Sequence, residues 1–195
     1  KAGERVLESL EQFLAKKLRL KVNQAKSKVA RADECTFLGY SMTFLKDGSK
    51  CLTLPRGTLQ WLRGKMQKVI GRRARGQSIE YVIQQLKPIL RGWYNYYCLA
   101  ETTLSFGDPD NYIRRRLRWL YWRHWKTPRT RRKRLIALGL RPEKARKTAY
   151  SSCGPWRSSR LPGVHQALTN SYFDKLGLFS LLQAHNGRMT ANTTV

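Results

Sequence analysis

A basic and aromatic stretch, DNYIRRRLRWLYWRHWK from Asp110 to Lys126, constrains the fold of this chain most strongly. Ile113, Leu117 and Leu120 recur in it at helical spacing, which predicts an amphipathic helix with one side in a core. Cations alternate with flat rings on another face, which carries Arg114, Arg118, Trp122 and Trp125. Guanidinium groups pair with phosphate and indoles stack on bases, so this second face favours nucleic-acid contact.

Residues at both ends of that stretch predict where helices begin and end. Asp108 or Asp110 can cap its start, and Pro109 suits a first helical position after Asp108. Thr127 and Pro128 predict that a new helix begins directly afterwards, and Gly139 predicts its end.

The net charge of the whole chain also favours a nucleic-acid partner. Its 39 Lys and Arg outnumber 12 Asp and Glu, which gives a formal charge of +27 and a pI near 10.7. Between residues 112 and 149, 15 Lys or Arg accompany one acid, Glu143. So much like charge destabilises a compact state unless a polyanion neutralises it. Nucleic acid is the first candidate partner and an anionic membrane surface the second, but no apolar run approaches the roughly 20 residues that span a bilayer.

The cysteines and histidines do not predict a metal site. Cys35, Cys51, Cys98 and Cys153 are scattered without a C-x-x-C pair, which is typical of reduced thiols in an intracellular protein. The three histidines also lack metal-ligand spacing. The chain begins at Lys1 without an initiator Met and runs straight into a helical pattern, so we expect a fragment of a longer protein.

The predicted fold class is mainly α with a small N-terminal α+β portion. A helix over residues 4–18 precedes extended segments at residues 20–23, 26–30 and 35–44, and a turn at Asp47-Gly48 pairs residues 51–54 back as a hairpin. After Pro55 the periodicity is helical, over about residues 56–75, 78–97, 110–126, 128–139, 142–149 and 164–175. The segment 151–163 is expected as a loop, and the tail from Gly187 as a frayed end.

Two ordered sets of residues resemble one family. LRLKVNQAKSKV followed by FLGYSM resembles the last palm motifs of group II intron-encoded reverse transcriptases. Farther on, LKPILRGWYNYY, then D-x-x-I-R-R-R-L-R-x-L, W-K, L-x-x-L-G-L, G-P-W and N-S-Y-F-x-x-x-G-L-x-S-L are similar to the maturase domain, domain X, of that family. The resemblance covers about residues 4–182. It implies a palm remnant over 1–54, thumb-like helices over 55–105, a maturase-specific domain over 106–186 and a polar tail over 187–195.

The resemblance also implies what this chain lacks. The family carries its catalytic aspartates in a Y-A-D-D motif just before the helix that starts here at Glu4, and this sequence begins after that point. Polymerisation needs carboxylates that hold Mg²⁺, so we expect no catalytic residue and no cofactor in this chain. Mg²⁺ is implied for the missing palm active site and for the intron RNA.

Residue roles follow from the same resemblance. Primer and template contacts are implied for Lys26, Phe37, Leu38, Gly39 and Tyr40. The candidate RNA-binding residues combine the resemblance with local charge: Arg63, Lys65, Arg72, Arg73, Arg91, Arg114, Arg115, Arg118, Trp122, Arg123, Lys126, Arg131, Arg132, Lys133 and Arg157. Trp93, Tyr96, Tyr97 and Trp156 are expected in the core. Of Trp119 and Trp122, one is expected to pack and the other to contact RNA.

The function expected from the sequence is binding of group II intron RNA in support of splicing, with possible contacts to a template-primer and to a missing N-terminal reverse transcriptase half. One alternative makes this chain part of an active RNA-directed DNA polymerase, and a weaker one makes it a generic structured-RNA binder. The expected location is the bacterial cytoplasm, with an organelle as the open alternative.

Overall fold

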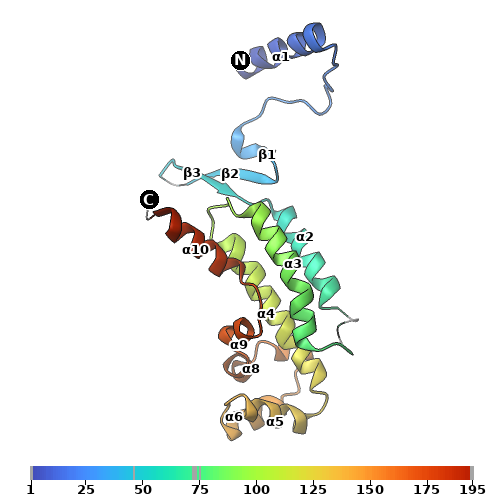
Figure 1. The fold of residues 1–195 in the computed structure, drawn as a ribbon, viewed down its shortest axis with the longest axis vertical. Helices are drawn as coiled ribbons and strands as arrows, with labels where there is room; N and C mark the ends of the chain where they lie inside the picture. The colour runs from blue at the N-terminus through green and yellow to red at the C-terminus, as the bar shows by residue number, and fades with distance from the viewer. Residues whose placement is uncertain (1, 46, 72–73, 75, 194–195) are drawn as a thin grey trace.

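The computed structural model describes residues 2–45, 47–71, 74 and 76–193. The mainly helical class with a small sheet near the N-terminus is confirmed (Figure 1). The N-terminal part comprises α1 (Ala2–Leu18), the 3-10 turn η1 (Ala32–Glu34), β1 (Thr36–Phe37), β2 (Tyr40–Phe44) and β3 (Lys50–Thr53). The helical part comprises α2 (Arg56–Val69), α3 (Ile79–Tyr97), α4 (Leu104–His124), α5 (Pro128–Ala137), α6 (Pro142–Ala149), α7 (Pro155–Ser158), α8 (Pro162–Ala167), α9 (Asn170–Lys175) and α10 (Leu181–Thr193).

The sheet is a three-stranded antiparallel meander in the order β1-β2-β3. Its first turn places Leu38 and Gly39 at φ 49° and 77°, the left-handed geometry of a tight hairpin. The turn approaches α3 closely, because a Cβ on Gly39 would lie 3.1 Å from the Tyr97 ring. The strands expected at residues 20–23 and 26–30 are absent, since the amides of Lys26 and Ser27 both bond to the Asn23 carbonyl in a turn.

Helix α1 lies beyond the sheet, away from the helical bundle (Figure 1). None of its described residues is buried. The apolar stripe that predicted this helix, including Leu10 and Phe13, is about half exposed.

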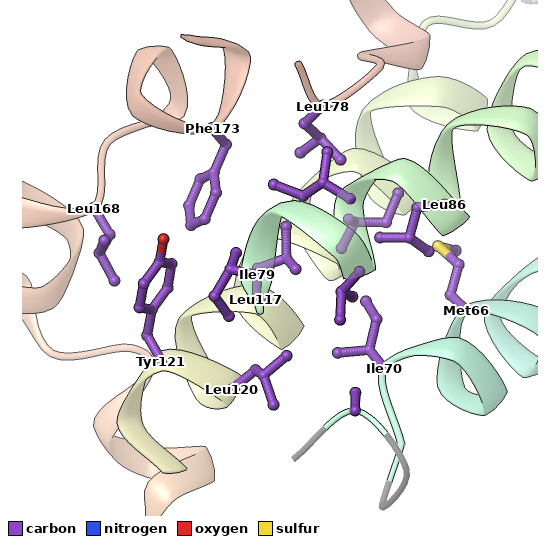
Figure 2. Packing of buried hydrophobic residues seen from close by; sticks show 14 of the residues in the cluster. Met66, Ile70, Ile79, Leu86, Leu117, Leu120, Tyr121, Leu168, Phe173 and Leu178 are labelled. Carbon is purple, nitrogen blue, oxygen red and sulfur yellow. The ribbon is translucent and has the colours of Figure 1, made fainter. Parts of the chain in front are cut away.

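The core is centred on α2, α3 and α4, with further residues from α5, α6, α8, α9 and α10, and Figure 2 shows part of it from close by. Met66 of α2 and Ile70, which directly follows that helix, pack near Leu86 of α3. Leu117 and Leu120 of α4 belong to the same buried cluster. The apolar side of α4 is therefore a core face, as its spacing predicts.

Two of the expected helices differ in their bounds from the sequence-based prediction. Helix α4 begins at Leu104, so Pro109 lies inside it and neither Asp108 nor Asp110 caps its start. Its first turn is held by the buried ring of Phe106, which packs edge-on against Trp93 and Tyr94. The helix expected over 164–175 is two helices, because Thr169 accepts a hydrogen bond from the Tyr172 amide and starts α9.

The expected loop and tail are also partly helical. The short helix α7 lies within the segment 151–163, which was predicted as a loop. The frayed end expected from Gly187 is wrong, because α10 continues to Thr193.

Candidate nucleic-acid interface

Arg114 and Arg118 do not lie on an exposed face of α4, and the prediction that they do is wrong. Arg114 lies 3.7 Å from Asp110 Oδ2 and 3.5 Å from Asp174 Oδ1. Arg118 donates from Nε to the Leu168 carbonyl at 2.9 Å and from a terminal nitrogen to Asn170 Oδ1 at 3.2 Å. These two cations therefore tie α4 to the segments around α9.

Burial also affects the pKa of one of these two cations, Arg118. Desolvation, followed by repulsion from Arg114, lowers the pKa of Arg118 to about 10. Arg118 stays charged at neutral pH, because this pKa is still far above 7. Its charge is used in holding the fold and is not presented to a ligand.

A second group of cations on α4 is stacked on aromatic rings. The guanidinium of Arg115 lies 3.8 Å from the centroid of Trp156, and that of Arg116 lies 5.2 Å from Trp119 and 5.8 Å from Tyr112. We call these five side chains the stacked cluster. Stacking fixes the plane of a guanidinium while leaving its edge available to an anion.

Trp156 was predicted to anchor the G-P-W loop in the core, and this is wrong. Its side chain is 38% exposed and covers Arg115 at the surface. Arg160 lies close enough to Arg115 that its charge, after desolvation, helps to lower the pKa of Arg115. Two repelling cations beside an exposed ring form a surface that an anion would stabilise.

A cleft of about 770 Å³ opens beside the stacked cluster. It lies where the end of α4 meets the segment before α3 and the start of α7. Three cations line it: Arg123, Lys126 and Arg131. We call it the basic cleft, and its described lining residues are Gly76, Gln77, Ser78, Trp122, Arg123, His124, Lys126, Arg131 and Pro155.

Arg131 is held in place at the rim of the basic cleft. Its Nε donates to the Trp125 carbonyl at 2.9 Å, and its guanidinium lies 4.7 Å from the Trp122 ring centroid. Desolvation lowers its pKa. Trp122 also lines the cleft but is fully buried, so of Trp119 and Trp122 it is the one that packs, and its assignment to RNA contact is wrong. Trp119 is half-buried and belongs to the stacked cluster.

Helix α5 continues the cationic surface away from the basic cleft. It begins as predicted, because Thr127 accepts a hydrogen bond from the Thr130 amide and Pro128 occupies its first turn. Arg132 and Lys133 are exposed on it, and Arg157 is exposed on the neighbouring α7. Within the described part of the chain, none of these three side chains forms an ion pair.

Residues 59–138 match the family model of the group II intron maturase-specific domain. The chain contains a maturase domain of a group II intron protein. The match begins within α2 and ends at the residue after α5, so it includes the basic cleft apart from Pro155 and the stacked cluster apart from Trp156. A comparison with curated proteins finds no match.

The maturase domain brings together one subset of the predicted RNA-binding residues. Arg123, Lys126 and Arg131 meet in the basic cleft, with Arg132 and Lys133 following on α5. Arg63 reaches the edge of the stacked cluster, where its guanidinium lies 5.7 Å from the Tyr112 ring.

The remaining predicted cations are dispersed. Lys65 is exposed and lies 5.2 Å from the Trp61 ring, and Arg91 is exposed on α3. Arg72 and Arg73 lie outside the described residues.

The residues assigned to primer contact lie away from the maturase domain's basic cleft. Lys26 is exposed in the segment after α1, and Phe37 and Leu38 are exposed at the first hairpin turn. Tyr40 is tied to α3, since its hydroxyl donates to the Tyr96 carbonyl at 2.6 Å. Their role in holding a primer stays a prediction.

The aromatic run RGWYNYY divides between core and surface. Trp93 is buried, as expected, and Tyr97 is half-buried against it with ring centroids 5.0 Å apart. Tyr96 was expected in the core, but its side chain is 56% exposed. It sits at the C-terminal end of α3, where its hydroxyl donates to the Leu38 carbonyl in the hairpin turn.

Sequence reasoning missed several residues of this surface. Tyr112 and Arg116 were missed, although they and Trp119 lie three or four positions apart, a helical spacing that could have revealed the stacked cluster. No local signal places Gln77 or Pro155 in the basic cleft, because they come from distant segments. Among the described residues, no group of His, Cys, Asp or Glu could hold a metal ion, and no helix is long and apolar enough to cross a membrane.

Proposed function

We propose that this chain binds group II intron RNA through the basic cleft, the stacked cluster and the exposed face of α5. By holding the RNA there, it supports the folded state of the intron in which splicing proceeds. The observation that carries this proposal is the set of cations from Arg123 to Lys133 that lack an acidic partner within the described residues.

The carboxylates of Asp110 and Asp174 do not compete for the charge of this surface, because they are already used. Asp110 and Asp174 both lie against the buried Arg114. The cations on the other faces are left with solvent and counterions. Binding a phosphate chain releases those counterions, which is the main source of affinity for nucleic acids.

In the stacked cluster, aromatic rings fix the orientation of two of the charged guanidinium groups. Arg115 and Arg116 are held flat against Trp156 and Trp119, so less side-chain entropy is lost when they pair with phosphate. A structured RNA places its phosphates at fixed positions, and fixed guanidinium groups suit such a target better than mobile lysines.

The test compares two double variants by filter binding with intron RNA. Arg132→Gln with Lys133→Gln removes two exposed charges from α5, and Lys16→Gln with Lys17→Gln removes two exposed charges from the distant α1. The α5 variant is expected to bind more weakly and to lower the slope of log affinity against log salt by about 2. The α1 variant is expected to bind like the parent chain, and equal losses in both would refute the assignment of this surface.

A competition experiment separates intron binding from generic RNA binding. Group II intron RNA and an unrelated structured RNA of equal length would compete for the chain at moderate salt. Preferential binding of the intron, together with faster splicing in its presence, supports the maturase role. Equal competition by the unrelated RNA would contradict it.

A further inference from the structure

A second cleft shares a wall with the basic cleft. It has a volume of about 450 Å³, and Ser78 and His124 line both clefts. Three aromatic side chains line this second cleft, Tyr121, Trp125 and Tyr172, together with the opposite charges of Glu80 and Arg134. We call it the aromatic cleft.

The two clefts differ in the chemistry they offer. The described lining of the basic cleft contains three cations and no carboxylate. Cations without a carboxylate beside them suit a phosphate group.

The aromatic cleft offers parts of three rings, since Tyr172 is half-buried and Tyr121 and Trp125 are 9% and 7% exposed. Its rings are close together, with Tyr121 and Trp125 centroids 5.3 Å apart and Tyr121 and Tyr172 centroids 6.1 Å apart. Figure 2 shows Tyr121 among the core residues, with its hydroxyl directed toward the side of Leu168 and Phe173. Glu80, exposed in the first turn of α3, supplies an acceptor at the same cleft. Rings beside a carboxylate suit a nucleobase, which stacks by its face and donates from its amino groups.

The geometry points to a binding site for one unpaired nucleotide of the RNA, and we propose that its phosphate lies in the basic cleft and its base in the aromatic cleft. This rests on the proposed function, because it specifies which RNA feature the same surface selects. A paired base has no free face to offer to the rings of the aromatic cleft. A base in a bulge is already unpaired, so placing it there costs little.

The first experiment measures affinity for three hairpin RNAs by fluorescence anisotropy. One has an uninterrupted stem, one carries a single bulged nucleotide, and one carries an abasic residue at the bulge. The bulged hairpin is expected to bind about 5- to 100-fold more tightly than the uninterrupted one, the range set by stacking of one base. The abasic bulge should lose most of this gain. Equal affinities for all three hairpins would overturn the nucleotide site while leaving the proposed function intact.

The second experiment fills the aromatic cleft without changing charge. Ala137→Trp places a large ring in the cleft from an exposed position at the end of α5, and Ala191→Trp makes the same change on the exposed side of α10. Ala137→Trp is expected to lower the preference for the bulge, measured as the ratio of the affinities for the bulged and the uninterrupted hairpin, to about one. Ala191→Trp should keep the preference.

The outcomes distinguish the two proposals. A preference for the bulge that survives Ala137→Trp, with an unchanged urea unfolding midpoint, would refute the site. Failure to bind any of the three hairpins or the intron RNA would refute the proposed function, and the nucleotide site with it.

Discussion

Arg118 and Arg132 are the same residue type on adjoining helices in opposite surroundings. Arg118 is 5% exposed and its donors meet the Leu168 carbonyl and Asn170. Arg132 is exposed without an ion pair in the described residues. The contribution of a guanidinium therefore depends on the groups around it, and the two positions can be separated by experiment.

Replacing Arg118 with Ala is expected to lower the free energy of unfolding by about 2–4 kcal/mol. The buried Leu168 carbonyl would lose its donor, and the long side chain would leave a gap in the packing. Urea denaturation followed by circular dichroism measures the change.

Arg132→Ala is the matched control for that measurement. It should change the free energy of unfolding by less than about 0.5 kcal/mol, as expected for an exposed site, and should weaken RNA binding instead. The assignment of Arg118 to the fold would be wrong if Arg118→Ala left stability unchanged and reduced only RNA affinity.

His185 provides a second prediction at this scale. Its ring is buried, stacks on Phe106 at 4.3 Å, and has no hydrogen-bond partner on either nitrogen within the described residues. Desolvation, with a smaller contribution from Arg188, lowers the pKa of His185 below the ordinary value of 6.5. As pH falls through 6.5, the unfolded chain takes up a proton before the folded chain does, so stability is lost on acidification.

His185→Phe should reduce this loss, because Phe can stack on Phe106 and does not titrate. The measurement is the urea midpoint of both proteins above and below pH 6.5. His165, whose pKa is also lowered by burial, will leave a residual dependence in the variant. An identical pH dependence in both proteins would rule out a contribution from His185.

At the scale of elements, one carboxylate joins α4 to α10. Asp110 accepts hydrogen bonds from the Ser180 hydroxyl at 2.6 Å, the Leu181 amide at 3.0 Å and the Leu182 amide at 3.2 Å. It therefore caps the start of α10, a helix about 70 positions away in the chain, instead of the helix to which it belongs. A carboxylate at a helix N-terminus is also favoured by the helix dipole.

Asp110→Ala is expected to cost about 3–5 kcal/mol, the range for breaking a buried charged pair by removing one partner. Helix α10 should loosen first, so the Leu181 and Leu182 amides would exchange with solvent faster in hydrogen-exchange measurements. Asp108→Ala, two residues away at an exposed position of α4, should have little effect. Equal exchange rates at Leu181 in the two variants would contradict the capping role.

The elements also show where sequence reasoning works. Helices α5 and α6 were predicted with nearly the observed bounds, because Thr127, Pro128, Gly139 and Pro142 are local signals and Gly139 has the positive φ of 88° that ends α5. The start of α4 and the burial of Arg118 could not be predicted in this way. Their causes are tertiary: the partners of Arg118 lie 50 and 52 positions away in the sequence. The stretch 110–126 showed which residues could bind RNA, and only the packing showed which of them do not face solvent.

At the scale of the whole molecule, the formal charge of +27 should make folding and RNA binding respond to salt in opposite directions. Salt screens repulsion among the cations, so the thermal midpoint of the free chain should rise as salt is added. Salt also reduces the counterion release that drives RNA binding. With six to ten phosphate contacts, affinity should fall by about 10³- to 10⁵-fold between roughly 50 and 200 mM salt.

Both responses can be measured on one preparation, by differential scanning fluorimetry for the free chain and by filter binding for the intron RNA. A rise in the midpoint together with a steep fall in affinity would mean that the same charges oppose folding and drive binding. The RNA would then act as the counterion that this fold lacks, and its addition at low salt should raise the midpoint more than an equal concentration of phosphate does. An affinity that does not change with salt would exclude the phosphate backbone as the main contact.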